Sequence, residues 1–317
     1  MRVTSAQRPS GPSPRGRRIG PWAAGFDIQG HRGAKAHLPE STWPGFLRAV
    51  ELGSTSVEFD VRLTGDGDVV VWHDATLARA DPALPADVAG AWIADLPTSV
   101  VVATAVRPGS APILRLRDLL GRMGEQLPTT WAVVEVKVDH NVRGAPIARE
   151  ALVDAVLGDI AATGFGRAVV HSFDWAVLDQ ARRTASHLPR SALVEAKTLQ
   201  PGSPWLGGVD PAGWRSPHDV VAAAVVAGAD ALAPNWRWPT GADSEPGSRI
   251  VSGGLLDAAF VGAAHDAGLP VVPWTVNDPA QIARLIDLGV DGIVSDSPEL
   301  VTRALTSARR PSGGSHG

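Results

Sequence analysis

The sequence predicts an α/β fold: a single TIM-type (β/α)8 barrel with an extra β-hairpin and a short irregular insertion. The chain has 317 residues, of which 44% are hydrophobic. One barrel of about 250 residues with extensions accounts for this length. Short runs rich in β-branched residues alternate with helical patterns, at the spacing of βα units. Polar residues gather where the predicted strands end, which is where barrel enzymes carry their chemistry.

Eight segments have the composition of barrel strands: 26–30, 56–61, 131–137, 168–173, 191–195, 231–234, 270–276 and 292–295. Helical patterns separate most of them, at 42–52, 148–163, 175–186, 217–227, 255–267, 279–288 and 298–305. Several of these helices stop at glycine, a common C-terminal residue, including Gly53, Gly228, Gly268 and Gly289.

A further strand at 69–72 follows the second barrel strand too closely for a parallel crossover, so we expect it to fold back as a hairpin. Asp66 and Gly67 predict a two-residue turn, which would place Asp60 opposite His73. Glu58 lies two residues before Asp60, so both carboxylates leave the same face of the strand. We therefore expect an acidic cluster with an imidazole beside it. Residues 75–112, rich in proline and without a clear period, are expected to form the irregular insertion.

Composition limits the possible ligands and partners. The sequence has no cysteine, so a bound metal must be held by oxygen or imidazole. A net charge of -4 and the lack of a basic stripe argue against nucleic acid as a partner. The longest weakly polar stretch, 220–233, is interrupted by Gly228 and Asp230 and is too short to span a bilayer.

Both ends of the chain are expected to lie outside the barrel. Residues 1–20 are rich in arginine, proline, serine and glycine and lack the apolar run of a secretory signal, which predicts a disordered leader. Residues 306–317 are expected to form a disordered tail, leaving one domain at 21–305. These features favour a cytoplasmic protein.

Several short motifs resemble those of the glycerophosphodiester phosphodiesterases. They are His31-Arg32-Gly33, Pro39-Glu40-Ser41-Thr42, Val57-Glu58-Phe59-Asp60-Val61, Leu63-Thr64 with Asp66-Gly67, Val70-Val71-Trp72-His73-Asp74, Glu135-Val136-Lys137, Ser172-Phe173-Asp174, Trp274-Thr275-Val276-Asn277 and Gly289-Val290-Asp291-Gly292-Ile293-Val294-Ser295-Asp296. Each motif alone is weak, but their order and spacing over residues 27–305 make the resemblance specific. It implies a barrel enzyme with a divalent metal ion, Ca2+ or Mg2+, that cleaves glycerophosphodiesters to glycerol 3-phosphate and an alcohol.

The resemblance also implies roles for individual residues. It makes Glu58, Asp60 and Glu135 the metal ligands, His31 and His73 the general acid and base, Arg32 and Lys137 the phosphate ligands, and Trp274 a neighbour of the substrate. Hard oxygen ligands suit Ca2+ and Mg2+, and a cation offsets the negative charge of a phosphodiester. Imidazole titrates near neutral pH, so two histidines can divide the proton transfers.

Several alternatives stay open at this point. Lys137 contacts phosphate or simply pairs with Glu135, Glu40 interacts with a helix N-terminus or supports Arg32, and Trp274 flanks the substrate or packs in the barrel. The sequence does not assign acid and base between the histidines, nor the nucleophile, which is water or a neighbouring glycerol hydroxyl. The preferred ion, the alcohol and the oligomeric state are also undetermined.

Two other functions are compatible with the motifs: a phospholipase D-like enzyme acting on lysophospholipids or sphingolipids, and a noncatalytic phosphodiester-binding protein. The chain departs from the usual family pattern at Ser41, where asparagine is common, and at Arg117, where an acidic residue is frequent. His171 is expected near the rim of the barrel, whereas five other histidines are predicted to be surface residues: His37, His140, His187, His218 and His265.

Overall fold

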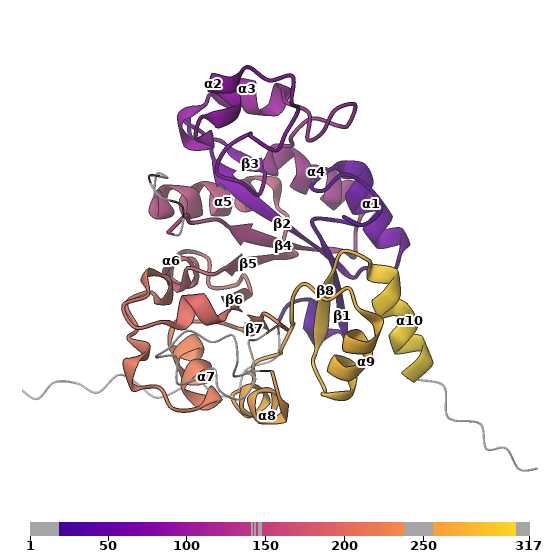
Figure 1. The fold of residues 1–317 in the computed structure, drawn as a ribbon, viewed down its shortest axis with the longest axis vertical. Coiled ribbons are helices and arrows are strands. Elements are labelled where there is room, and N and C mark those ends of the chain that lie inside the picture. Colours follow the sequence, from indigo (N-terminus) through magenta and orange to yellow (C-terminus); the bar gives the residue numbers. More distant parts are fainter. Residues whose placement is uncertain (1–18, 141, 143, 145–147, 238–255, 309–317) are drawn as a thin grey trace, which may run out of the picture.

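The computed structural model describes residues 19–140, 142, 144, 148–237 and 256–308. Its core is a parallel sheet in the order β7-β6-β5-β4-β2-β1-β8 (Figure 1). The strands are β1 (Asp27–His31), β2 (Ser56–Leu63), β4 (Trp131–Val136), β5 (Ala168–Ser172), β6 (Arg190–Val194), β7 (Ala231–Pro234) and β8 (Gly292–Ser295). The predicted α/β fold class is confirmed.

The segment 270–276 closes the sheet into a barrel between β7 and β8. On one side, Val272 N donates to Leu232 O at 2.8 Å and Trp274 N donates to Pro234 O at 3.1 Å. On the other side, Val294 N donates to Pro273 O at 3.0 Å, and Val276 N donates to Val294 O at 2.9 Å. The segment therefore occupies the eighth position in the ring, as the sequence predicts.

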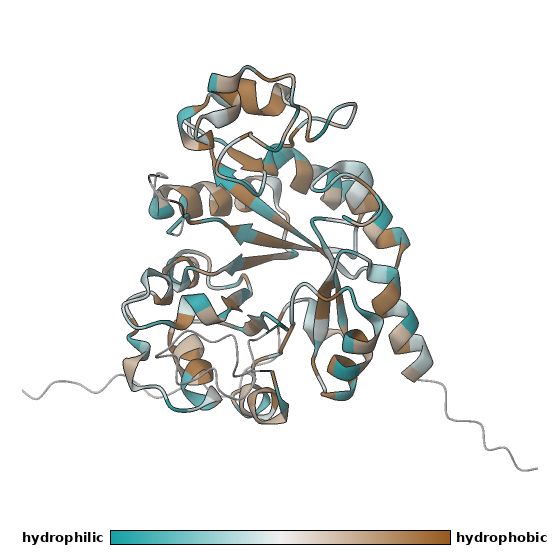
Figure 2. Ribbon diagram, viewed as in Figure 1, coloured by the Kyte–Doolittle hydropathy of each residue, from teal (hydrophilic) through white to brown (hydrophobic). Residues whose placement is uncertain are grey.

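Helices surround the strands: α1 (Trp43–Glu51), α4 (Leu116–Gln126), α5 (Arg149–Thr163), α6 (Trp175–Thr184), α7 (Pro217–Val226), α8 (Ala258–Asp266), α9 (Pro279–Asp287) and α10 (Pro298–Ala308). The strands are hydrophobic over most of their length, whereas the helices combine polar and apolar faces (Figure 2). Along β2, Val57, Phe59 and Val61 join the large core outside the barrel. The alternating residues of β2 thus point into the barrel.

The hairpin formed by β2 and β3 (Val69–Val71) has a different register from the predicted one. Val61 pairs with Val71 and Leu63 pairs with Val69, so Asp60 lies opposite Trp72 rather than His73. The reason is a three-residue loop: Thr64 N donates to Asp68 O at 2.9 Å, and Gly67 adopts a φ of 85°. The predicted two-residue turn is wrong, and His73 lies beyond the paired residues of β3.

Residues 75–112 contain more regular structure than expected. They include the short helices α2 (Ala86–Gly90) and α3 (Thr98–Ala103), which lie beside β3 at the top of Figure 1. These elements enclose a separate apolar cluster that includes Trp72, Leu77, Ile93 and Val101. The insertion therefore covers the hairpin with its own small core.

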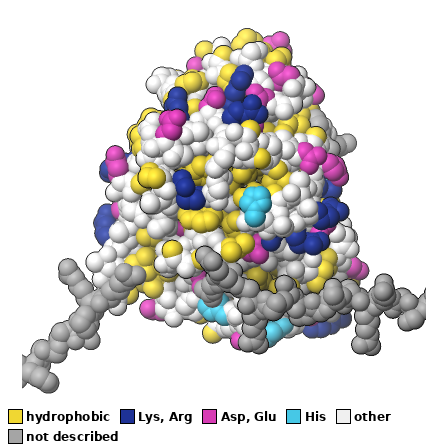
Figure 3. All heavy atoms as spheres, turned by 180° about the vertical axis from the view of Figure 1, so that it is seen from behind, with side chains coloured by type: hydrophobic (Ala, Val, Ile, Leu, Met, Phe, Trp, Pro, Cys, Tyr) yellow, Lys and Arg dark blue, Asp and Glu magenta, His cyan; other side chains and the backbone are white. Residues whose placement is uncertain are grey.

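The sequence reading also missed α4, although Leu116, Leu119, Leu120 and Met123 are buried at helical spacing. Among the described residues, none of the helices is both long and apolar enough to cross a membrane. On the face shown in Figure 3, acidic and basic side chains are interspersed, without a broad patch of either sign.

Candidate active site

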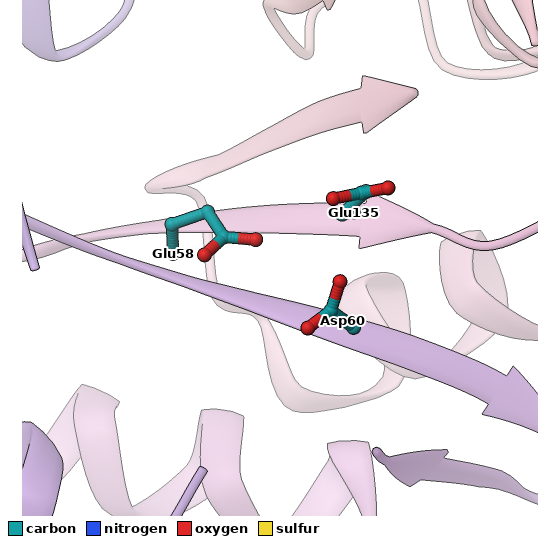
Figure 4. A group of neighbouring side chains, drawn as sticks. All are labelled: Glu58, Asp60 and Glu135. Atoms are coloured by element: carbon teal, nitrogen blue, oxygen red, sulfur yellow. The ribbon is translucent and has the colours of Figure 1, made fainter. Parts of the chain in front are cut away.

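Three buried carboxylates meet inside the barrel, at the carboxyl ends of its strands. Glu58 and Asp60 come from β2, and Glu135 comes from β4, where it pairs in register with Asp60. The three side chains point toward one another (Figure 4). One carboxylate oxygen from each lies within 4.8 Å of the others, and the residues are 3%, 1% and 7% exposed. Three hard oxygen donors at this separation suit a divalent cation.

Two basic side chains partly balance this acidic cluster. The Arg32 Nε atom lies 3.0 Å from Asp60 Oδ2. The Lys137 Nζ atom lies 3.0 Å from Asp60 Oδ1 and 2.5 Å from Glu135 Oε1. Lys137 thus forms the ion pair that the sequence reading considered, and its ammonium also lies beside the cavity. Glu58 is bound by the Arg32 backbone N at 3.2 Å.

The charges shift the pKa values of the three carboxyl groups in different directions. Burial, reinforced by the carboxylates of Asp60 and Glu135, holds the pKa of Glu58 well above its usual range. Burial likewise raises the pKa of Glu135 to about 7, although Lys137 opposes the shift. Burial would also raise the pKa of Asp60, but Lys137 and Arg32 hold it well below its usual range. Burial thus disfavours the ionised forms of Glu58 and Glu135, whereas the two cations stabilise the ionised form of Asp60.

Glu40 supports Arg32 rather than a helix N-terminus. Its Oε1 atom lies 3.2 Å from Arg32 NH1 and 3.1 Å from Arg79 NH2. Thr42 takes the role of helix cap instead, accepting from Gly45 N at 3.3 Å. Arg32 and the neighbouring Ser41 both adopt positive φ values, 50° and 57°. Asparagine, which is common in the family at the position of Ser41, adopts positive φ values more readily than serine does.

The first histidine, His31, ends β1 beside Glu58. Its Nδ1 atom lies 2.6 Å from Asp296 Oδ1, and its Nε2 atom lies 3.9 Å from Glu58 Oε2. Asn277 fixes Asp296 by donating to its second oxygen at 2.7 Å. Burial lowers the pKa of His31, with Asp296 acting in the opposite direction. The Asp296 contact orients the ring and leaves Nε2 toward the acidic cluster.

The second histidine, His73, has the same kind of partner. Its Nδ1 atom lies 2.6 Å from Asp74 Oδ1, and Arg79 binds Asp74 in turn. Burial lowers the pKa of His73, opposed by Asp74 and Asp60. Asp74 and Asp296 are site residues that the sequence motifs alone do not identify. The sequence does contain a signal for both aspartates. Each follows the end of a predicted strand and stands next to another polar residue of the same motif.

These groups border a cavity of about 610 Å³. Its lining includes all the predicted site residues except Asp60, which lies beneath it and is 1% exposed. The Trp274 indole faces the Phe173 ring edge-on at 5.5 Å and donates to Ala233 O at 2.7 Å. His171 also lines the cavity, as expected for a residue near the rim.

The prediction that His140 is a surface residue is wrong. Its side chain is 9% exposed, and its Nε2 atom lies 2.8 Å from Asp174 Oδ2. Trp205 contacts the ring edge-on, with the centroids 4.8 Å apart. Arg117, the departure noted in the sequence, binds Asp159 at 2.7 Å, on the outer side of the barrel between α4 and α5. It therefore takes no part in the cavity.

Comparisons with known proteins agree with the geometry. Residues 31–300 match the model of the glycerophosphoryl diester phosphodiesterase family. A crystal structure from Silicibacter pomeroyi, described as a "putative glycerophosphoryl diester phosphodiesterase", is 31% identical and superimposes with a TM-score of 0.68, covering 89% of this chain and 94% of that one.

Two more distant proteins extend this similarity. A glycerophosphodiester phosphodiesterase of Caldanaerobacter subterraneus is 23% identical over 85% of this chain and 93% of its own length. A phosphodiesterase of Oleispira antarctica, solved with the product sn-glycerol-3-phosphate, has the same fold, with a TM-score of 0.69 at 18% identity over 91% of this chain and 100% of that one.

Proposed function

This chain belongs to the glycerophosphoryl diester phosphodiesterase family. On that premise we propose that it hydrolyses glycerophosphodiesters to glycerol 3-phosphate and an alcohol, using a divalent metal ion and two histidines. The observation that carries the proposal is that the buried carboxylates of Glu58 and Glu135 line the same cavity as two histidines, His31 and His73, each of which is paired with an aspartate. The product held by the Oleispira antarctica relative agrees with this substrate class.

The donor set fits Ca2+ or Mg2+. All three side chains offer oxygen, which hard divalent ions prefer, and one oxygen of each lies within 4.8 Å of the others. We assign Glu58, Asp60 and Glu135 as the ligands. A bound ion would supply positive charge to the phosphate oxygens and hold the phosphodiester in a fixed orientation.

The protein itself provides the remaining charge and the proton transfers. Arg32 and Lys137 lie at the cavity with their cationic groups beside Asp60, where they can bind phosphate oxygens. Of His31 and His73, one takes the proton of the attacking hydroxyl and the other donates a proton to the leaving alkoxide. The aspartate on each Nδ1 atom orients the ring so that Nε2 exchanges the proton. Trp274 and Phe173 provide an apolar wall for the carbon atoms of the substrate.

The test measures glycerol 3-phosphate released from glycerophosphocholine by the full chain, with Ca2+ or Mg2+ and after treatment with a chelator. We expect product only with a divalent ion. Lysophosphatidylcholine serves as a parallel substrate, and faster turnover of it would favour the phospholipase D-like alternative. Absence of product from any common glycerophosphodiester, with either ion, would contradict the proposal.

The His73→Ala variant tests the proton transfers. We expect its kcat to fall by about 100-fold to 10,000-fold, the usual contribution of a general acid or base. The matched control is His265→Ala. The Nε2 atom of His265 lies 2.8 Å from Asp291 Oδ2, and His265 does not line the cavity. Equal turnover by the His73→Ala variant and the wild type would contradict the assignment of His73 to proton transfer.

A further inference from the structure

Arg62 extends the row of charged side chains on the inner face of β2. It lies two residues after Asp60 and four after Glu58, so the three side chains leave the same side of the strand. Its side chain is only 9% exposed. Among the described residues, it donates no hydrogen bond to Glu58 or Asp60. Its donors bind other groups instead, and the residue lines the same cavity as Glu58.

The guanidinium of Arg62 binds two chain segments at once. Its NH2 atom donates to Asp139 Oδ1 at 3.0 Å, and its NH1 atom donates to the other oxygen of the same carboxylate. Its Nε atom donates to the backbone carbonyl of His73 at 2.8 Å, and NH2 donates to the same carbonyl at 2.5 Å. One edge of the planar guanidinium therefore binds a carboxylate, and another edge binds a backbone carbonyl.

Both segments carry residues of the proposed active site. The first contains His73, which lies beyond the paired residues of β3; the hairpin ladder ends with Trp72 N donating to Asp60 O at 3.0 Å. The second contains Asp139, two residues after Lys137 and four after Glu135. Arg62 is thus a direct bridge between the backbone of one proposed proton-transfer residue and the segment that carries a phosphate ligand.

We infer that Arg62 is a positioning residue that fixes the His73 imidazole relative to Lys137 and the acidic cluster. The inference rests on the proposed function, because it assigns the position of a group used there. Asp74 orients the His73 ring about its own bonds, whereas Arg62 holds the backbone from which the ring extends. A displacement of about 1 Å in a reacting group is enough to reduce turnover about 100-fold.

The main test is Arg62→Lys, which keeps the positive charge but loses the planar fork. We expect kcat for glycerophosphocholine to fall about 10-fold to 100-fold while KM changes less than about threefold, since substrate ligands remain in place. Asp139→Asn is a second variant in case Arg62→Lys folds poorly. It should lose less kcat than Arg62→Lys, because Arg62 keeps its bonds to the His73 carbonyl.

Arg190→Lys is the matched control. Arg190 is also buried, at 6% exposed, and it also binds one carboxylate and backbone carbonyls: Asp230 at 2.6 Å, Gly228 O at 2.6 Å and Leu188 O at 2.9 Å. It begins β6, at the opposite end of the barrel from the cavity. We expect this variant to lose thermal stability but keep its kcat, which separates positioning from general support of the fold.

A His73→Ala background provides the decisive readout. If Arg62 acts through His73, Arg62→Lys should change the residual kcat of that background by less than about twofold. The inference is overturned if Arg62→Lys keeps wild-type kcat, or if it causes the same loss with and without His73. Turnover by the wild type is measured alongside. An inactive wild type would contradict the proposed function, which distinguishes that outcome from failure of this inference alone.

Discussion

The barrel buries carboxylates at both ends of β1 and β2, and the two ends hold them in different ways. At the amino end, Asp27 is 0% exposed and accepts hydrogen bonds from Thr55 Oγ1 at 2.6 Å, Ser56 Oγ at 2.8 Å and Gln29 Nε2 at 2.6 Å. At the carboxyl end, Glu58 and Asp60 face each other, Glu135 and two cations. The first group is satisfied by neutral donors, whereas the second combines charges of both signs.

The difference indicates which end serves stability and which serves function. Neutral donors around Asp27 complete its hydrogen bonding without any further ligand, and the end is sealed by Trp22, which is 3% exposed inside the barrel. The acidic cluster instead holds like charges a few ångströms apart, which costs stability unless a cation joins them. The protein therefore groups like charges where a metal ion and substrate are proposed to bind, and surrounds the buried carboxyl group at the amino end with neutral donors.

The largest expected effect is on activity, from Glu58→Gln. The substitution removes one proposed metal ligand, and we expect kcat/KM to fall about 100-fold to 1,000-fold, in line with the several kcal/mol that a cation contributes to the transition state. Thermal unfolding should show equal or higher stability, because glutamine avoids the cost of ionising a buried carboxyl group whose pKa burial raises. Wild-type activity in this variant would show that the two ends do not differ in function.

The second effect is on stability, from Asp27→Ala. The truncation removes the acceptor of Thr55, which is exposed, and of Ser56 and Gln29, which are buried, and should reduce the free energy of unfolding by about 1 to 3 kcal/mol. Urea titration measures this loss, and kcat of the folded variant should equal that of the wild type. A tenfold lower kcat at full folding would mean that the amino end also contributes to catalysis.

The smallest effect is a pH dependence, seen by comparing Asp27→Asn with the wild type. Burial raises the pKa of Asp27 above 3.8, so its contribution to stability is present below that pH and is lost as the pH rises through the folded-state value. Asparagine does not titrate. The stability of the variant relative to the wild type should therefore increase as the pH rises from 4 and then level off. A difference that is constant or falls over this range in urea titrations would contradict the assignment.

The sequence predicted which residues lie at the carboxyl end of the barrel better than it predicted the contacts that position them. Alternation along β2 predicted that Glu58 and Asp60 share one face, because strand periodicity is local. Glu135 and the roles of the two histidines came instead from the family resemblance of the strand-end motifs. The hairpin register was wrong, since the side chain of Thr64 stabilises a three-residue loop that the Asp66-Gly67 pair does not reveal. His140 was also misplaced, because its partner Asp174 is 34 residues away and only the folded chain brings them together.

The most direct test of the contrast between the two ends is the thermal unfolding of chelator-treated protein before and after addition of Ca2+ or Mg2+. A ligand that binds only the folded state raises the midpoint temperature. We predict an increase for the wild type and for Asp27→Asn, and no increase for Asp60→Asn or Glu135→Gln. An equal increase in all four proteins would place the ion elsewhere and contradict the account.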